Sequence, residues 1–131
     1  MAVEAPGLSI GFLKVPSTAF STKQYTAVTA QSCEGFITTP SDSGAVLGVM
    51  QDAPTVAGEA VNIMYAGASK MQFNASIAPG ANWIVGTDGK AHSTGSAVTG
   101  SAVYGPVLIN PGTTAGDIGT VMLNSVGPTT V

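Results

Sequence analysis

The sequence predicts a mainly β protein: a small single-domain β-barrel or compact sandwich with an extended N-terminal arm and little helix. Its apolar runs are short and rich in β-branched or aromatic residues, as buried strands are. Turn-forming Gly, Pro, Asn and Asp residues separate these runs at regular intervals, which is typical of chains that fold as many short strands. No segment sustains the 3.6-residue period of a helix, and a chain of 131 residues needs only one domain.

Two central apolar runs organise the rest of this prediction. Residues 46–50 and 61–65 indicate buried strands, because each run is too short for an ordinary helix. Residues 51–58 connect them and contain Asp, Pro and Gly, so a turn-rich loop is expected there. Further strands are expected at residues 25–30, 34–38, 71–73, 83–85, 103–109 and 118–123.

Turn residues refine this outline. Asp88-Gly89 predicts a hairpin with a type I′ turn, because both residue types readily adopt the positive φ angles of that turn. Pro106 predicts an edge position or a bulge in its strand. Residues 93–101 are expected to form a loop, and a short helix at residues 40–45 or 113–117 remains open.

The two ends of the chain are expected to lie outside the β-domain. The predicted division is an extended N-terminal arm at residues 1–22, the β-barrel or sandwich domain at residues 23–124 and a C-terminal tail at residues 125–131. Within the arm, Leu8, Ile10 and Phe12 alternate with small residues, which predicts one apolar face on an extended segment. Two placements remain open: the arm completes its own domain as an edge strand, or it lies on another subunit by β-augmentation.

Composition argues against several partners. Only 8% of the residues are charged, the formal net charge is −3, and the chain has four lysines, scattered along the sequence, and no arginine. Nucleic acids and anionic membranes are bound by clustered cations, so neither is an expected partner. No apolar stretch is long enough to span a bilayer. The N-terminus lacks the pattern of a secretory signal, and Cys33 has no second cysteine to pair with, so synthesis in a cytoplasm is expected.

The sequence contains no constellation of residues that indicates catalysis. His92 is the only histidine and Cys33 the only cysteine, which is too few for a catalytic triad or a zinc site. His92 is expected to be an exposed turn residue and Cys33 a buried or half-buried thiol. The seven acidic residues are spread singly, mostly in turns. We therefore expect a protein that is not an enzyme, with no catalytic, cofactor-binding or metal-binding residues.

The order and spacing of the turn residues carry a family resemblance. The run VLGVMQDAPTVAGEAVNIMYAGASKM, followed by IAPGANWIVGTDGKA and AVYGPVLINPGTTAGDIGTVML, resembles the small capsid cement, or decoration, proteins of tailed bacteriophages. The chain departs from the family pattern at residues 81–83, where Ala-Asn-Trp replaces an acidic residue, and in its longer N-terminal arm. The matching residues are Gly48, Val49, Gln51, Pro54, Gly58, Glu59, Val61, Gly67, Lys70, Ile77, Gly80, Asp88, Gly89, Lys90, Ala91, Gly105, Gly116, Asp117, Val121 and Leu123.

The resemblance implies a structural virion protein on the outer face of the phage head. Proteins of this family stabilise the expanded capsid by bridging neighbouring major capsid subunits, commonly as homotrimers at local threefold positions. The implied partners are the major capsid protein and further copies of the chain. The alternative is a carbohydrate- or surface-binding β-module, in which Trp83, Tyr65 or Tyr104 stacks on a ligand. For the capsid and subunit interface we expect Leu8, Ile10, Phe12, Phe20, Tyr25 and Trp83.

Overall fold

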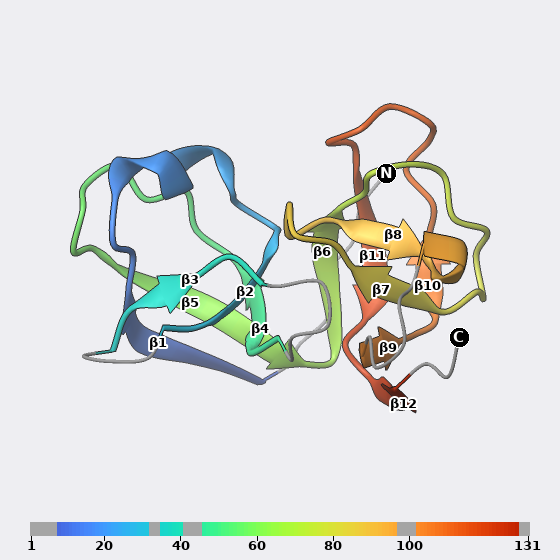
Figure 1. The fold of residues 1–131 in the computed structure, drawn as a ribbon, viewed down its shortest axis with the longest axis horizontal. Coiled ribbons are helices and arrows are strands. Elements are labelled where there is room, and N and C mark those ends of the chain that lie inside the picture. Colours follow the sequence, from blue (N-terminus) through green and yellow to red (C-terminus); the bar gives the residue numbers. More distant parts are fainter. Residues whose placement is uncertain (1–7, 32–34, 41–45, 97–101, 129–131) are drawn as a thin grey trace.

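The protein folds as short strands arranged in three antiparallel sheets (Figure 1). The computed structural model describes residues 8–31, 35–40, 46–96 and 102–128, and no sheet within these ranges closes into a barrel. A mainly β, sandwich-like domain with little helix is therefore confirmed. The strands are β1 (Leu8–Lys14), β2 (Ala27–Ala30), β3 (Ile37–Thr38), β4 (Gly48–Met50), β5 (Ala60–Ala66), β6 (Ala68–Gln72), β7 (Trp83–Val85), β8 (Ala91–Ser93), β9 (Ala102–Tyr104), β10 (Val107–Ile109), β11 (Ile118–Met122) and β12 (Ser125–Pro128), and the 3₁₀ turns are η1 (Thr18–Thr22) and η2 (Thr94–Ser96).

The first sheet, in the order β1-β5-β4-β2-β3, places its central strands between two hydrophobic clusters. Successive side chains of a strand point to opposite faces of its sheet. Val28 and Met50 accordingly face a first cluster, whereas Ala27 and Val49 face a second. The β2–β4 pair thus contributes to both clusters and joins the two halves of the molecule.

The first cluster lies against one face of this sheet and is completed by the chain that follows β1. Leu13, Val15 and Phe20 pack there with Val61 and Ile63 of β5. Phe20 comes from η1, which brings its ring into the cluster. The segment after β1 is therefore part of the core in its own chain.

The first sheet curls towards closure without reaching it. Lys14, at the end of β1, forms a single parallel bridge with Phe36, just before β3, and its N–H donates to the Gly35 carbonyl oxygen at 2.9 Å. The Lys14 ammonium group also lies 5.1 Å from the centre of the Phe36 ring. One bridge is less than the continuous ladder that closes a barrel. β1 consequently remains an edge strand over most of its length.

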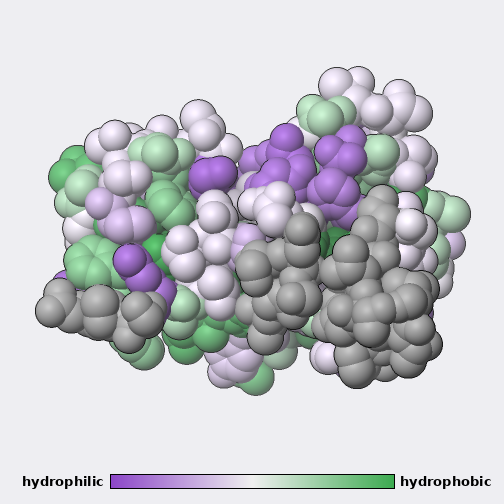
Figure 2. All heavy atoms as spheres, viewed as in Figure 1, coloured by the Kyte–Doolittle hydropathy of each residue, from purple (hydrophilic) through white to green (hydrophobic). Residues whose placement is uncertain are grey.

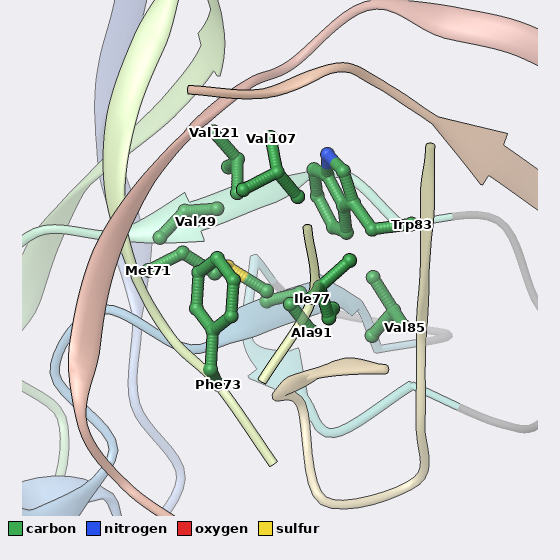
Figure 3. Packing of buried hydrophobic residues seen from close by; sticks show 10 residues of the cluster. Val49, Met71, Phe73, Ile77, Trp83, Val85, Ala91, Val107 and Val121 are labelled. Atoms are coloured by element: carbon green, nitrogen blue, oxygen red, sulfur yellow. The ribbon is translucent and has the colours of Figure 1, made fainter. Parts of the chain in front are cut away.

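The second cluster fills the space between the first sheet and the other two sheets, β10-β11-β6 and β12-β9-β7-β8. Figure 3 shows side chains from β4, β6, β7, β8, β10 and β11 converging on it. Trp83 and Phe73 are its largest fully buried side chains. A parallel bridge between Phe73 and Ala91 ties the segment after β6 to β8.

Tyr25 links the two halves of the molecule through its backbone. Its N–H donates to the Met50 carbonyl oxygen at 2.7 Å, and its carbonyl oxygen accepts from the Gln72 N–H at 2.8 Å. Its φ angle is 63°, a positive value that no other described non-glycine residue has. A side chain in this region costs on the order of 1–3 kcal/mol, which persists only where the surroundings hold the residue in place. Here the strands on both sides supply that constraint.

Glutamine side chains add polar contacts at the same junction. Gln24 Nε2 donates to the Gln51 carbonyl oxygen at 2.9 Å, and Gln72 Nε2 donates to the Gln24 carbonyl oxygen at 2.7 Å. Gln51 Nε2 in turn donates to Ser69 Oγ at 3.1 Å. Nearby, β5 continues into β6 across Gly67, whose φ of 95° suits glycine alone. The junction is thus hydrogen-bonded as well as packed.

The hairpin predicted at Asp88-Gly89 is present, but its turn is of another type. β7 pairs with β8, and the Gly89 N–H donates to the Gly86 carbonyl oxygen at 2.9 Å. Gly89 has a φ of 78°, whereas Asp88 is not among the residues with positive φ. A type I′ turn needs two consecutive positive φ angles, so this loop is instead typical of a type I turn followed by a left-handed glycine.

Other segments differ from the sequence prediction in two situations: where a turn residue divides an expected strand, and where the element is very short. The expected strand at residues 103–109 divides at the cis Gly105-Pro106 bond into β9 and β10. β8 and β12 occupy segments expected as turn, loop or tail, and residues 113–117 form no helix. Elements of three or four residues are too short to leave a periodic pattern. The other possible helix, at residues 40–45, falls outside the described residues except for Pro40, and Cys33 does so entirely.

Candidate functional site

The strongest candidate contact surface is the outer side of β1. β1 is seven residues long and stands at the end of its sheet, so β5 is its one paired strand in the described part of the chain. The other strands at sheet ends, β3, β6, β8, β10 and β12, have two to five residues. An edge strand carries N–H and C=O groups that another strand can pair with. Of the two placements left open for the arm, the structure has the edge strand of its own sheet.

Leu8, Ile10 and Phe12 do not share one face of β1, contrary to the alternation in the sequence. The register against β5 shifts between Leu8 and Ser9 and again between Ile10 and Leu13. The second shift inserts an extra residue into β1, which leaves Leu13 only 8% exposed and turns Phe12 outwards, to 72% exposure. Ile10 is partly buried against the first cluster, and Leu8 is 58% exposed. Leu8 and Phe12 with the backbone between them form what we call the β1 edge.

Phe20 and Tyr25 lie elsewhere. Phe20 is only 6% exposed and belongs to the first cluster, so its ring is held in the core. Tyr25 is half-buried against the second cluster, and the Lys70 ammonium group lies 5.5 Å from its ring centre. The residues expected at the interface are therefore distributed among the β1 edge, the two clusters and the junction.

Trp83 is a core residue. It is 0% exposed and stacks on Tyr104, with ring centroids 5.0 Å apart and an interplanar angle of 29°. Burial raises the pKa of Tyr104, and a hydrogen bond with the Val46 backbone only partly offsets this rise. Trp83 Nε1 is buried without a hydrogen-bond partner in the described part of the chain. This indole face cannot stack on an external ligand, because Tyr104 and the cluster already cover it.

An apolar hollow lies beside this aromatic pair among the described residues. Sugars are usually held by aromatic stacking together with several convergent polar groups. Of the three aromatic residues proposed for a carbohydrate, Tyr65 is exposed, at 42%, whereas Trp83 is buried and Tyr104 is half-buried. The lining is mostly aliphatic and aromatic: Ala27, Val46, Leu47, Gly48, Val49, Tyr65, Trp83, Tyr104 and Leu123.

The β7–β8 turn contains a hydrogen-bonded pair, His92 and Asp88, that the sequence analysis did not identify. His92 Nε2 lies 2.9 Å from Asp88 Oδ1 and 3.2 Å from Oδ2, and the Lys90 N–H donates to Oδ1 at 2.9 Å. Burial raises the pKa of Asp88, but these hydrogen bonds and the neighbouring positive charges outweigh it and hold that pKa below its ordinary value. The His92 side chain is 20% exposed, so His92 is a half-buried partner of Asp88 rather than an exposed turn residue. The sequence signal that could have predicted this contact is a histidine four residues after the Asp of an Asp-Gly turn.

This pair shapes a turn that packs on the first sheet. The Gly89 carbonyl oxygen accepts from the Ala27 N–H of β2 at 2.8 Å. In the ranges that the structure describes, no three His, Cys, Asp or Glu side chains gather closely enough to hold a metal ion. No helix among these residues is long and apolar enough to cross a membrane.

No protein-family model matches the chain, and no curated protein is similar to it. The pattern behind the phage resemblance can still be compared with the turns of the structure. Five of its glycines adopt positive φ angles: Gly58, Gly67, Gly80, Gly89 and Gly116. The pattern thus records backbone positions that this fold requires of glycine. Taken alone, this glycine pattern reports on the fold and does not identify a binding partner.

Proposed function

We propose that the protein is a structural virion protein that binds the outer surface of an expanded phage capsid and bridges neighbouring major capsid subunits. The observation that carries the proposal is the β1 edge, where Phe12 is 72% exposed on a seven-residue edge strand. Folding leaves this apolar side chain in water, and docking would bury it. The sequence resemblance to capsid cement proteins and the scarcity of charged residues agree with a protein made for association.

The proposed action is thermodynamic and needs no catalytic group. A protein that binds the expanded shell better than the precursor shell stabilises the expanded state by mass action. If copies associate as trimers, several modest contacts made together give high avidity through effective concentration. The major capsid subunit and further copies of the chain are the partners in this scheme.

Co-sedimentation with expanded, undecorated heads of the phage that encodes the chain tests this proposal. We expect saturable binding, together with a higher temperature or lower salt concentration at which the heads rupture. Absence of binding at micromolar protein would reject the proposal. Binding that leaves the rupture threshold unchanged would reject the stabilising role.

Point substitutions locate the contact better than deletion of the arm. Removing β1 would also remove the pairing with β5 and the core residue Leu13, so lost binding could reflect unfolding. Phe12→Ser and Leu8→Ser change exposed side chains and leave the register in place. We expect both variants to bind heads more weakly than the parent protein does.

A further inference from the structure

Three of the four lysines lie on segments that come together where the two halves of the molecule join. Lys23 precedes Tyr25 by two residues, and Lys70 lies on β6, whose Gln72 N–H donates to the Tyr25 carbonyl oxygen. Lys90 follows Gly89 in the turn that packs on β2. Figure 2 shows hydrophilic side chains gathered over this junction, with pale or apolar surface around much of it. The segments that carry these three lysines are thus joined at one junction, and we call its polar surface the lysine face.

Lys70 is held in place by a constrained partner. Its ammonium group lies 5.5 Å from the centre of the Tyr25 ring. Tyr25 keeps its φ of 63° through backbone hydrogen bonds to both halves of the molecule, so the position of its ring is fixed by the fold. A cation over an aromatic face gains electrostatic stabilisation, which favours one position for the Lys70 side chain.

The lysine face has little countercharge of its own. No carboxylate among the described residues lies within ion-pair distance of Lys23, Lys70 or Lys90. Asp88, in the same turn as Lys90, is already bound by His92 and by the Lys90 N–H. The Lys90 charge contributes to the low pKa of Asp88 and is partly engaged there. Lys23 and Lys70 are thus the cations most available to an external partner.

We infer that the lysine face docks a carboxylate-rich segment of a partner protein. Ammonium groups are compact point charges that pair with carboxylates without a demanding geometry, so an extended acidic segment suits them. A nucleic acid fits less well, because its affinity depends on many phosphate contacts and three lysines supply few. β1 carries none of these three lysines, so the inference is independent of the capsid proposal.

The test measures binding of a fluorescent oligo-glutamate peptide to the full chain by anisotropy. We expect saturable binding at low ionic strength that weakens as salt is added. In Lys23→Gln/Lys70→Gln we expect binding roughly three- to tenfold weaker, because each exposed ion pair contributes modestly. Lys14→Gln is the matched control, since Lys14 lies at the end of β1, and it should bind as the parent does. Lys23→Gln alone serves if the double variant fails to fold, because the Lys23 side chain has no hydrogen bond or ion pair with the described residues.

Three results would overturn the inference. The first is failure of the parent chain to bind oligo-glutamate at low ionic strength. The second is a loss of binding in Lys14→Gln as large as that in the double variant. The third is competition by an oligothymidylate of equal length that is as strong as competition by free oligo-glutamate. Sedimentation velocity of the parent chain tests whether a second copy of the chain occupies the lysine face. Self-association that Lys23→Gln/Lys70→Gln abolishes would make a second copy the occupant and overturn the choice of partner. Because no phage heads are used, failure here is distinct from failure of the capsid proposal.

Discussion

Phe12 and Phe20 are two similar residues of the N-terminal segment with opposite surroundings, which makes them a matched pair. Both were expected at an interface from the sequence. Phe12 is 72% exposed on the β1 edge, whereas Phe20 is 6% exposed in the first cluster. Substitution of each by alanine should therefore separate binding from stability. Phe12→Ala should weaken binding to heads, and Phe20→Ala should destabilise the fold.

The expected sizes follow from burial. Burying a Phe side chain completely contributes about 1.5–3 kcal/mol. Because 72% of Phe12 is exposed in the free protein, its burial at a contact should contribute roughly 1–2 kcal/mol, and its loss should raise the Kd about 5- to 30-fold. Phe12→Ala should change the free energy of unfolding by no more than about 0.5 kcal/mol. Phe20→Ala should lower it by about 3–5 kcal/mol, through lost burial and the cavity that remains.

Urea titration measures the free energy of unfolding of each variant, and co-sedimentation with undecorated heads measures the Kd. Equal destabilisation by the two substitutions would contradict the outward orientation of Phe12. Unchanged head binding by Phe12→Ala would show that the β1 edge is not the contact. The second result would leave the fold intact and remove the observation on which the proposed function depends.

Three further predictions concern the fold. Gly89→Ala should lower the free energy of unfolding by about 1–3 kcal/mol in urea titration, because Gly89 has a φ of 78° and an added Cβ would crowd β2. Gly95→Ala is the control: a Cβ added there lies 3.7 Å from its nearest neighbour, so the free energy of unfolding should stay close to that of the parent. Trp83 is the only tryptophan and is 0% exposed, so its emission should be blue-shifted and resist acrylamide, and ready quenching would contradict its burial. The lowered pKa of Asp88 means that its contribution to stability is present above its ordinary pKa of 3.8 and is lost as the pH falls through the lower folded value. The urea midpoint should therefore fall less steeply in acid for Asp88→Asn, and identical slopes would contradict this account.

The fold class and most strand positions could be predicted because they depend on local patterns. β-branched and aromatic runs between turn residues located β4, β5 and β7 nearly to their ends. The pairing partners of the strands could not be predicted in the same way, because they depend on which strands meet in space. β2 and β4 are buried on both faces, and one sequence cannot say which cluster each side chain enters.

The candidate surfaces illustrate the same limit. Alternation in β1 predicted three apolar residues on one face, but the shift in register depends on how β5 pairs with β1. The lysine face joins segments around Lys23, Lys70 and Lys90 that only the tertiary fold brings together. From the sequence these cations were expected to be scattered. Tyr25 also gave no local sign of a positive φ, because that angle follows from its hydrogen bonds to both halves of the molecule.

The two surfaces can be tested for joint action, because Phe12 and Lys23 lie on different segments of the chain. Phe12 lies on β1, whereas Lys23 follows η1 and lies at the junction. Substitutions at distant, independent sites change binding free energy additively, to within about 0.5 kcal/mol. If both surfaces contact the same head, Phe12→Ala/Lys23→Gln should therefore weaken head binding by the product of the two single fold-changes. If the acidic partner is another protein, Lys23→Gln should leave head binding unchanged and the double variant should match Phe12→Ala. A double variant that departs from both values would mean that the surfaces are coupled through the fold, and the junction at Tyr25 would then be the element to examine.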